Sequence, residues 1–156
     1  MNARPKMSTA DAAAELLARI LYAEAGERPL RAVEGLAALA VNRAAAARRC
    51  SEARLRFAGG AEAPNPPRAL LAVLRAPFGF LVRHPRHPLH ARFSRPPEGD
   101  AALAMCRRIA ARALAGALPD STGGALLWHD EARQPDWALG RMPSAELGGF
   151  FFYPLR

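Results

Sequence analysis

The apolar positions near the start of the chain repeat with the i, i+3, i+4, i+7 spacing of a helix with one buried face. They are Ala13, Leu16, Leu17, Ile20 and Leu21. Ser8 precedes this run and Asp11 follows Ser8 by three residues, which predicts a capped helix start. Gly26 and Pro29 then interrupt the pattern. The sequence therefore predicts an amphipathic helix between Ser8 and Gly26.

Glu24 is the next member of this apolar stripe, so a continuing helix directs its carboxylate toward the core or a cleft. Glu15 lies off the stripe, with Arg19 one turn later as a surface partner. Apolar surroundings disfavour a charged carboxylate and raise its pKa, as a general acid near neutral pH requires. The structural alternative is a buried glutamate that an arginine or backbone donors satisfy.

The rest of the chain predicts further helices and a small sheet. A helix over 30–49 has small or aliphatic inward residues, a short helix follows over 68–75, and Asp100 caps another that extends to Ala117. Residues 77–99 are rich in proline and predict a long irregular segment. The glycine-flanked runs "GGALLWH" and "LGGFFFY" predict short paired strands. The inward positions of the second helix are Val33, Leu36, Ala37, Ala40, Val41 and Ala44, and those of the last are Leu103, Cys106, Ile109, Ala113 and Leu114.

Length and composition indicate one domain over 1–156, with residues 1–8 expected to be flexible. The net charge of +8 predicts attraction to polyanions, although a solvated basic surface explains it equally well. Cys50 and Cys106 form no CxxC pair, predict neither a zinc site nor a disulfide scaffold, and can both be core thiols. No apolar run reaches the length of a membrane span, and no signal peptide is evident.

Three blocks in order resemble the SleB-type cell wall hydrolases, the spore-cortex-lytic enzyme family. They are "LARILYAEAGERPLRAVEGLAALAVNR", "ALAGALPDSTGGALLWH" and "PDWALGRMPSAELGGFFFY". The resemblance implies a lysozyme-like, mainly helical α+β domain with a small antiparallel β-sheet near the C-terminus. It also implies cleavage of the peptidoglycan sugar backbone, with Glu24 as the catalytic acid and with no cofactor.

Glycosidic bond cleavage commonly uses two carboxylates, and the sequence offers no evident second one on the same face. Glu27 and Glu34 are near Glu24 in sequence, but the break from Gly26 to Pro29 leaves their orientation open. A lytic transglycosylase needs one acid, because the C6 hydroxyl of muramic acid can itself attack and leave a 1,6-anhydro product. The sequence therefore favours a lytic transglycosylase or muramidase in which Glu24 acts first as acid and then as base.

The C-terminal blocks supply the candidate substrate-binding residues. Aromatic rings can stack on sugar faces and polar side chains can bind hydroxyls, while every one of these residues can equally be a core anchor or a turn residue. The candidates are Trp128, Trp137 and Tyr153 as ring faces, His129 and Thr122 as polar contacts, and Phe80 from the "PFGF" run.

Several positions depart from the family pattern. Gly79 stands in place of Gln, Leu81 of Ser and Arg83 of Trp, while Leu127 and Phe150 replace histidines. Polar sugar contacts are lost at these positions. An active enzyme with a changed substrate and a catalytically degenerate glycan-binding protein on the same fold both remain open.

The histidine-rich segment and the basic charge each suggest a further, weaker interpretation. His84, His87 and His90 could bind zinc, as in an amidase, but the intervening prolines exclude a helix that aligns them and arginines surround them, so we expect an exposed polar loop and no metal. The basic charge suits a nucleic-acid-binding protein, yet no recognition motif is present, so no specific nucleic acid is expected.

The expected partner is peptidoglycan, without membrane insertion, and the chain is expected to be a monomer. Because that substrate lies outside the inner membrane, we expect synthesis in the cytoplasm, action at the cell wall and release by a holin-like membrane-pore protein. A mis-assigned start codon that omits an upstream signal is the alternative.

Overall fold

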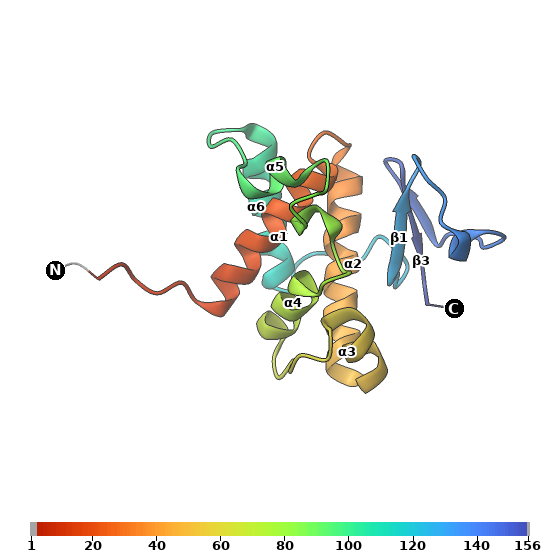
Figure 1. The fold of residues 1–156 in the computed structure, drawn as a ribbon, viewed down its shortest axis with the longest axis horizontal. Helices are drawn as coiled ribbons and strands as arrows, with labels where there is room; N and C mark the ends of the chain where they lie inside the picture. Colours follow the sequence, from red (N-terminus) through yellow and green to blue (C-terminus); the bar gives the residue numbers. More distant parts are fainter. Residues whose placement is uncertain (1–2, 156) are drawn as a thin grey trace.

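The computed structural model describes residues 3–155, in which a body of helices lies beside a small sheet (Figure 1). The helices are α1 (Thr9–Ala25), α2 (Leu30–Arg49), α3 (Ser51–Ala58), α4 (Pro66–Arg75), α5 (His90–Ser94) and α6 (Ala101–Leu114), with 3-10 turns η1 (Leu81–Arg83) and η2 (Asp136–Ala138). The strands are β1 (Leu127–Asp130), β2 (Ala145–Leu147) and β3 (Phe150–Tyr153). The mainly helical α+β class with a small C-terminal sheet is confirmed.

Side-chain caps start three of the helices. Ser8 Oγ accepts the Asp11 N–H at 3.0 Å, Asn65 Oδ1 accepts the Arg68 N–H at 3.0 Å, and Asp100 Oδ1 accepts the Ala102 N–H at 2.8 Å. The predicted starts at Ser8 and Asp100 are confirmed. The last helix ends at Leu114 instead of Ala117, because Gly116 adopts a φ of 70° that terminates it.

Two segments differ from the sequence-based expectation. Helix α3 was not expected, because its eight residues carry no clear apolar repeat; Gly59 closes it in the left-handed conformation. The segment 77–99 is irregular only in part, because it contains η1 and the short α5. The expected flexibility of residues 1–8 stays a prediction: residues 1–2 lie outside the described part, and residues 3–8 form an exposed extension (Figure 1).

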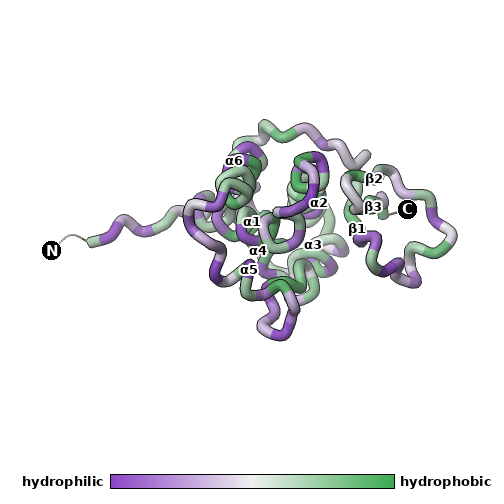
Figure 2. Tube along the Cα trace, turned by 90° about the horizontal axis from the view of Figure 1, so that it is seen from above, coloured by the Kyte–Doolittle hydropathy of each residue, from purple (hydrophilic) through white to green (hydrophobic). Residues whose placement is uncertain are grey.

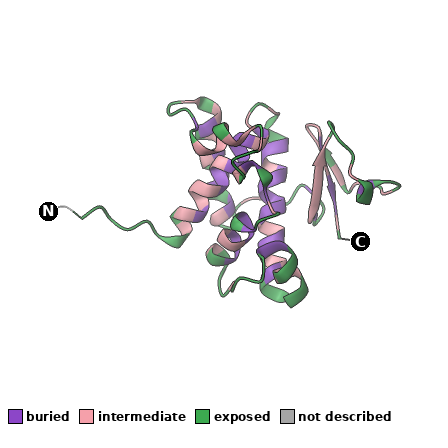
Figure 3. Cartoon of the chain, in the orientation of Figure 1, coloured by how far each residue is buried: buried purple, intermediate pink, exposed green. Residues whose placement is uncertain are grey.

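Helix α2 lies between the other long helices and the sheet (Figures 1 and 2). It packs on α3, α4 and α6 on one side and on β2 on the other, while α1 packs on α4, α5 and α6. Figure 3 shows the buried residues along the facing sides of α1 and α2. Gly35 brings α2 close to the sheet, since a Cβ there would lie 2.8 Å from Leu147 Cδ1 and 3.0 Å from Phe152 Cζ.

The sheet is antiparallel, with the order β1-β3-β2. Leu127 pairs with Tyr153 and Asp130 with Phe150, which confirms the predicted pairing of the two glycine-flanked runs. β1 is an edge strand, and Phe150 and Phe152 of the central strand are buried in the core. The sheet therefore attaches to the helical body through apolar side chains of β3.

Polar contacts from α2 fix the turn that precedes β1. Asn42 Nδ2 donates to Asp120 Oδ2 at 3.1 Å and to the Ala125 carbonyl at 3.1 Å. Asp120 Oδ1 in turn accepts the Thr122 N–H at 2.8 Å, and Asp120 Oδ2 accepts the Gly124 N–H at 2.8 Å. The "DSTGGA" turn is thus a hydrogen-bonded connection between α2 and the sheet.

The two cysteines lie in different environments. Cys106 is buried in the core, as expected, but Cys50 is exposed at the junction of α2 and α3, so the core interpretation was wrong for Cys50. Among the described helices, none combines the length and the apolar character that a membrane crossing needs.

Candidate active site

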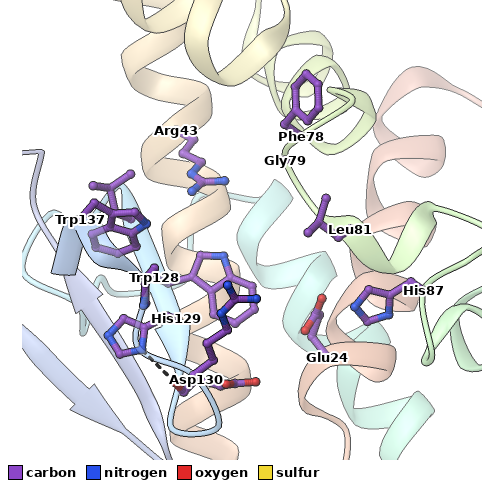
Figure 4. Close-up of a pocket in the computed structure, with 13 residues that line it drawn as sticks. Glu24, Arg43, Phe78, Gly79, Leu81, His87, Trp128, His129, Asp130 and Trp137 are labelled. Atoms are coloured by element: carbon purple, nitrogen blue, oxygen red, sulfur yellow. Dashed lines mark hydrogen bonds between the residues drawn. The ribbon is translucent and has the colours of Figure 1, made fainter. Parts of the chain in front are cut away.

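A cleft of about 480 Å³ opens between the end of α1, the η1 segment and the edge strand β1 (Figure 4). This volume is in the range of ligand-binding clefts. The lining residues come from distant parts of the chain, and they are Glu24, Arg43, Phe78, Gly79, Leu81, His87, Leu127, Trp128, His129, Asp130, Arg133, Pro135 and Trp137.

Glu24 lies in the last turn of α1, and its carboxylate points into the cleft (Figure 4). Burial, and to a lesser extent the charge of Asp130, raise its pKa from the ordinary 4.5 to about 7, against the opposing charge of Arg28. No hydrogen bond or ion pair to this carboxylate occurs within residues 3–155, so the alternative of a structurally satisfied glutamate is not supported. Glu15 pairs with Arg19 at 3.1 Å on the surface, as predicted.

Asp130 supplies the second carboxylate that the sequence analysis did not find. It ends β1 on the wall opposite Glu24, and both Trp128 and Asp130 project from β1 toward Glu24 (Figure 4). Alternation along a strand places residues i and i+2 on one face, so Trp128 carried the signal for Asp130. Glu27 is exposed and pairs with Arg92 at 2.7 Å, and Glu34 pairs with Arg112 at 3.7 Å.

Arg43 is a second site residue that sequence reasoning missed. Its side chain leaves α2 and points into the cleft, although the residue is only 8% exposed (Figure 4). The signal was available, since Arg43 follows Leu36 by seven positions and Ala40 by three and thus continues the inward stripe of α2.

An aromatic cluster forms the β-side of the cleft. Trp128, His129 and Trp137 line the cleft, and Trp137 is 41% exposed. His129 Nδ1 lies 2.8 Å from the Asp130 carbonyl, which can only accept, so Nδ1 carries the proton in the neutral ring. His129 Nε2 then accepts the Tyr153 hydroxyl at 2.9 Å. Trp137 packs edge-on against Tyr153 with ring centroids 5.2 Å apart.

The structure does not bring three of the predicted substrate-binding residues to the cleft surface. Tyr153 is 2% exposed and supports His129 from behind. Thr122 is fully buried, where its hydroxyl donates to Asp120 Oδ1 at 2.6 Å and accepts the Ala125 N–H at 3.1 Å. Phe80 is 2% exposed and lies under the Arg43 guanidinium at 5.7 Å. These three side chains lie behind the cleft surface, where they contact His129, Asp120 and Arg43.

Three of the five positions that depart from the pattern of SleB-type hydrolases line the cleft. Gly79, Leu81 and Leu127 line it, and Phe78 beside them is 92% exposed. Arg83 donates to the Leu74 carbonyl at 2.9 Å, and Phe150 is buried against Trp128 with centroids 5.0 Å apart. A Cβ at position 79 would lie 2.9 Å from the Val73 carbonyl oxygen, so the backbone here is fitted to glycine.

The three histidines of 84–90 do not converge. His84 Nδ1 accepts the Arg86 N–H at 3.2 Å, His87 Nδ1 accepts the Leu89 N–H at 3.1 Å, and His90 Nδ1 donates to the Val82 carbonyl at 2.8 Å. Within the described residues, no three His, Cys, Asp or Glu side chains form a group suited to a metal ion. His87 alone of the three lines the cleft.

Comparison with known proteins places this arrangement in a known fold. No protein-family model matches the sequence, and no curated protein matches it. A solved structure does match: the catalytic domain of the Bacillus cereus SleB protein superimposes with a TM-score of 0.62 over 98% of this chain and 96% of that chain. The two chains share a fold. The fold of the SleB catalytic domain is what the three sequence blocks predicted, although the sequences are only 19% identical. It is consistent with the lysozyme-like class expected for this chain.

Proposed function

We propose that this protein is a peptidoglycan hydrolase that cleaves the glycan strand, as a lytic transglycosylase or muramidase with Glu24 as general acid and base. One observation carries the proposal: a carboxyl with a pKa raised to about 7 faces an open cleft across from a second carboxylate. The SleB-like fold and the three sequence blocks support the same reaction class.

The chemistry follows from the two carboxyl groups. Protonated Glu24 donates its proton to the oxygen of the scissile glycosidic bond as that bond breaks. Positive charge develops on the sugar ring, and the negative charge of Asp130 stabilises it from the opposite wall. The Glu24 carboxylate then takes a proton from the group that attacks the anomeric carbon, which restores the acid.

The attacking group decides the product. Attack by the C6 hydroxyl of the same muramic acid gives a 1,6-anhydro end, whereas attack by water gives a reducing end. Glu24 can serve both as acid and as base in the first route, in which Asp130 contributes only its charge, and we propose this route for that reason. The carboxylate of Asp130 offers a site for the second, because a base opposite the acid can activate water.

The aromatic wall is the proposed sugar-binding surface. Trp128 and Trp137 present ring faces and edges to the cleft, and exposed Phe78 extends the apolar surface on the other side. Such rings pack well on the apolar faces of sugars. Tyr153, Thr122 and Phe80 are proposed to act by holding His129, the "DSTGGA" turn and Arg43 in place.

The decisive experiment incubates the purified protein with purified peptidoglycan and identifies the released fragments by mass spectrometry. Anhydro ends identify a transglycosylase and reducing sugar ends a hydrolase. Glu24→Gln should abolish fragment release while keeping the helical circular dichroism spectrum. Glu27→Gln, at an exposed glutamate in the following turn, should still release fragments. Equal rates for parent and Glu24→Gln would refute the role of Glu24.

A catalytically degenerate glycan-binding protein is the second candidate. The apolar residues Leu81 and Leu127 in the cleft favour it, since they stand where relatives carry polar groups. This candidate predicts that the protein sediments with peptidoglycan and releases no fragment. Release of stem peptides alone would instead indicate an amidase, and steeply salt-dependent DNA binding without any effect on cell walls a nucleic-acid-binding protein.

A further inference from the structure

We propose that Arg43 forms a carboxylate-binding subsite in the cleft, which selects glycan strands that carry a free acid near the cleaved bond. This inference rests on the proposed function, because it names a substrate feature that the same cleft recognises. Its basis is a buried guanidinium that points into the cleft without an acidic partner.

The Arg43 side chain is held in one orientation by its inner part. Its Nε donates to the Leu126 carbonyl at 2.7 Å, at the start of the edge strand. The guanidinium packs over the rings of Phe57 at 5.0 Å and Phe80 at 5.7 Å. The hydrogen bond uses only Nε, so the two terminal amino groups remain available at the cleft, which Arg43 lines (Figure 4).

The charge of Arg43 has no acidic partner among the described residues. Within residues 3–155, six ion pairs occur and Arg43 takes part in none of them. Its terminal amino groups make no hydrogen bond to any described residue. Burial and the nearby charge of Arg56 lower its pKa to about 10, so Arg43 remains a cation at neutral pH. A cation that is buried this deeply costs stability unless an anion compensates it.

The cleft offers this cation to a ligand. Glu24 and Asp130 belong to the catalytic end, while Arg43 lies beside Trp128 and Trp137 with Phe78 and Gly79 opposite (Figure 4). Exposed Arg133 adds a second positive charge to the lining. Two terminal amino groups in one plane match the two oxygens of a carboxylate, which favours a carboxylate over a neutral sugar hydroxyl.

Peptidoglycan can supply this carboxylate from two sources. The lactyl group of muramic acid is a free acid where the stem peptide has been removed and a neutral amide where the peptide is attached. The stem peptide itself carries free carboxylates further from the sugar. Both sources present the same chemistry to Arg43, and the experiment distinguishes them.

The test measures cleavage of four substrates by three proteins. The substrates are intact peptidoglycan, glycan strands stripped of stem peptides by an amidase, and each of these after carbodiimide conversion of carboxylates to neutral amides. The proteins are the parent, Arg43→Met and Arg56→Met. The last is a matched control, because exposed Arg56 also lies over Phe57, at 5.4 Å, but does not line the cleft.

We expect amidation to raise the KM of the parent and of Arg56→Met about tenfold, the usual effect of losing a charged hydrogen bond. Arg43→Met should have a KM on all four substrates as high as that of the parent on the amidated ones, so its KM should not respond to amidation. Its kcat should change less than its KM. A preference for the free acid on stripped strands assigns the lactyl carboxylate, and a preference only on intact strands assigns the stem peptide. Equal KM values for acid and amide forms in the parent overturn the proposal while leaving glycan cleavage intact.

A binding measurement keeps the inference testable if no substrate is cleaved. N-acetylmuramic acid and its methyl ester are titrated into the parent and Arg43→Lys by calorimetry. The parent should bind the acid and not the ester, and Arg43→Lys should retain part of this selectivity because it keeps the charge. Equal binding of acid and ester by the parent would refute the carboxylate subsite independently of catalysis.

Discussion

Asp130, at the end of β1, lies on the opposite wall of the cleft from Glu24, and its charge helps to raise the pKa of that glutamate. The effect adds to that of burial, which is larger, and outweighs the opposing charge of Arg28. Glu24 thus keeps its proton near neutral pH because of two elements that are far apart in the sequence. The sheet is therefore part of the acid's environment as well as a wall of the cleft.

The raised pKa of Glu24 predicts a pH-dependent stability difference. A carboxyl that titrates near 7 in the folded state and near 4.5 in the unfolded state binds more protons when folded between these values, so stability falls as pH rises through that window. Glu24→Gln removes this penalty. The variant should match the parent at pH 4 and exceed it by about 3 kcal/mol at pH 8, measured by urea unfolding.

Glu27→Gln is the control for this measurement, since Glu27 is exposed. It should show no comparable gain between pH 4 and pH 8. A Glu24→Gln variant whose advantage does not grow with pH would contradict the raised pKa.

We expect Asp130→Asn to shift the pH dependence of cleavage. Removing the negative charge lowers the pKa of Glu24, so the loss of activity on the alkaline side moves to lower pH. The maximal rate should also fall about 10²-fold, because one preorganised electrostatic group contributes about that much. The readout is the rate of peptidoglycan clearing from pH 4 to pH 9. Asp136→Asn, at the exposed first residue of η2, should change neither quantity. An unshifted profile for Asp130→Asn would remove Asp130 from the mechanism.

We expect Asn42→Ala both to lower the stability of the fold and to disturb the geometry of the cleft. The change breaks the bonds to Asp120 and to the Ala125 carbonyl, which should cost about 1–3 kcal/mol in thermal or urea unfolding. The turn before β1 then keeps only the bond from Arg43 to the Leu126 carbonyl as a link to α2, so KM for peptidoglycan should rise.

Asn65→Ala is the matched control, because it removes the cap of α4 and should cost about 1 kcal/mol without affecting the cleft. If both variants lose stability and neither changes KM, the Asn42 connection does not position the sheet.

The expected dependence on a membrane-pore partner stays a prediction, and it can be tested in cells. The chain is expressed in a Gram-negative host alone and together with a pore-forming protein, and the optical density is followed. Lysis only in the second culture is the expected result. Lysis by the chain alone, or recovery of the intact chain from the periplasm, would show that no pore is needed.

Much of the fold was predictable because local signals were strong. The apolar stripe of α1, the caps at Ser8 and Asp100 and the glycines that flank β1 and β3 each act over a few residues. Helix α3 was missed because eight residues with exposed Leu55 carry no clear periodicity, and its boundaries depend on packing against α2.

The site was predictable only in part for a different reason. Glu24 stood out because a charged residue continued an apolar stripe, and the same test applied to α2 would have found Arg43. Strand alternation groups Asp130 with Trp128, but its position opposite Glu24 arises only when the sheet packs against the helices, which no local pattern encodes. Thr122 and Phe80 carry suitable side chains for substrate, yet tertiary packing buries both.

One wall of the cleft comes from residues that are synthesised early, and the opposite wall comes from residues that are synthesised later. Glu24 and Arg43 leave the ribosome long before β1 and β3, and β3 lies close to the end of the described chain. Until residues 127–137 have been made, a nascent chain therefore holds the acid without Asp130, Trp128 or Trp137 opposite. A chain whose translation stops before β3 therefore contains Glu24 and Arg43 but lacks the strand that pairs with β1, so the wall opposite the acid is not held in place.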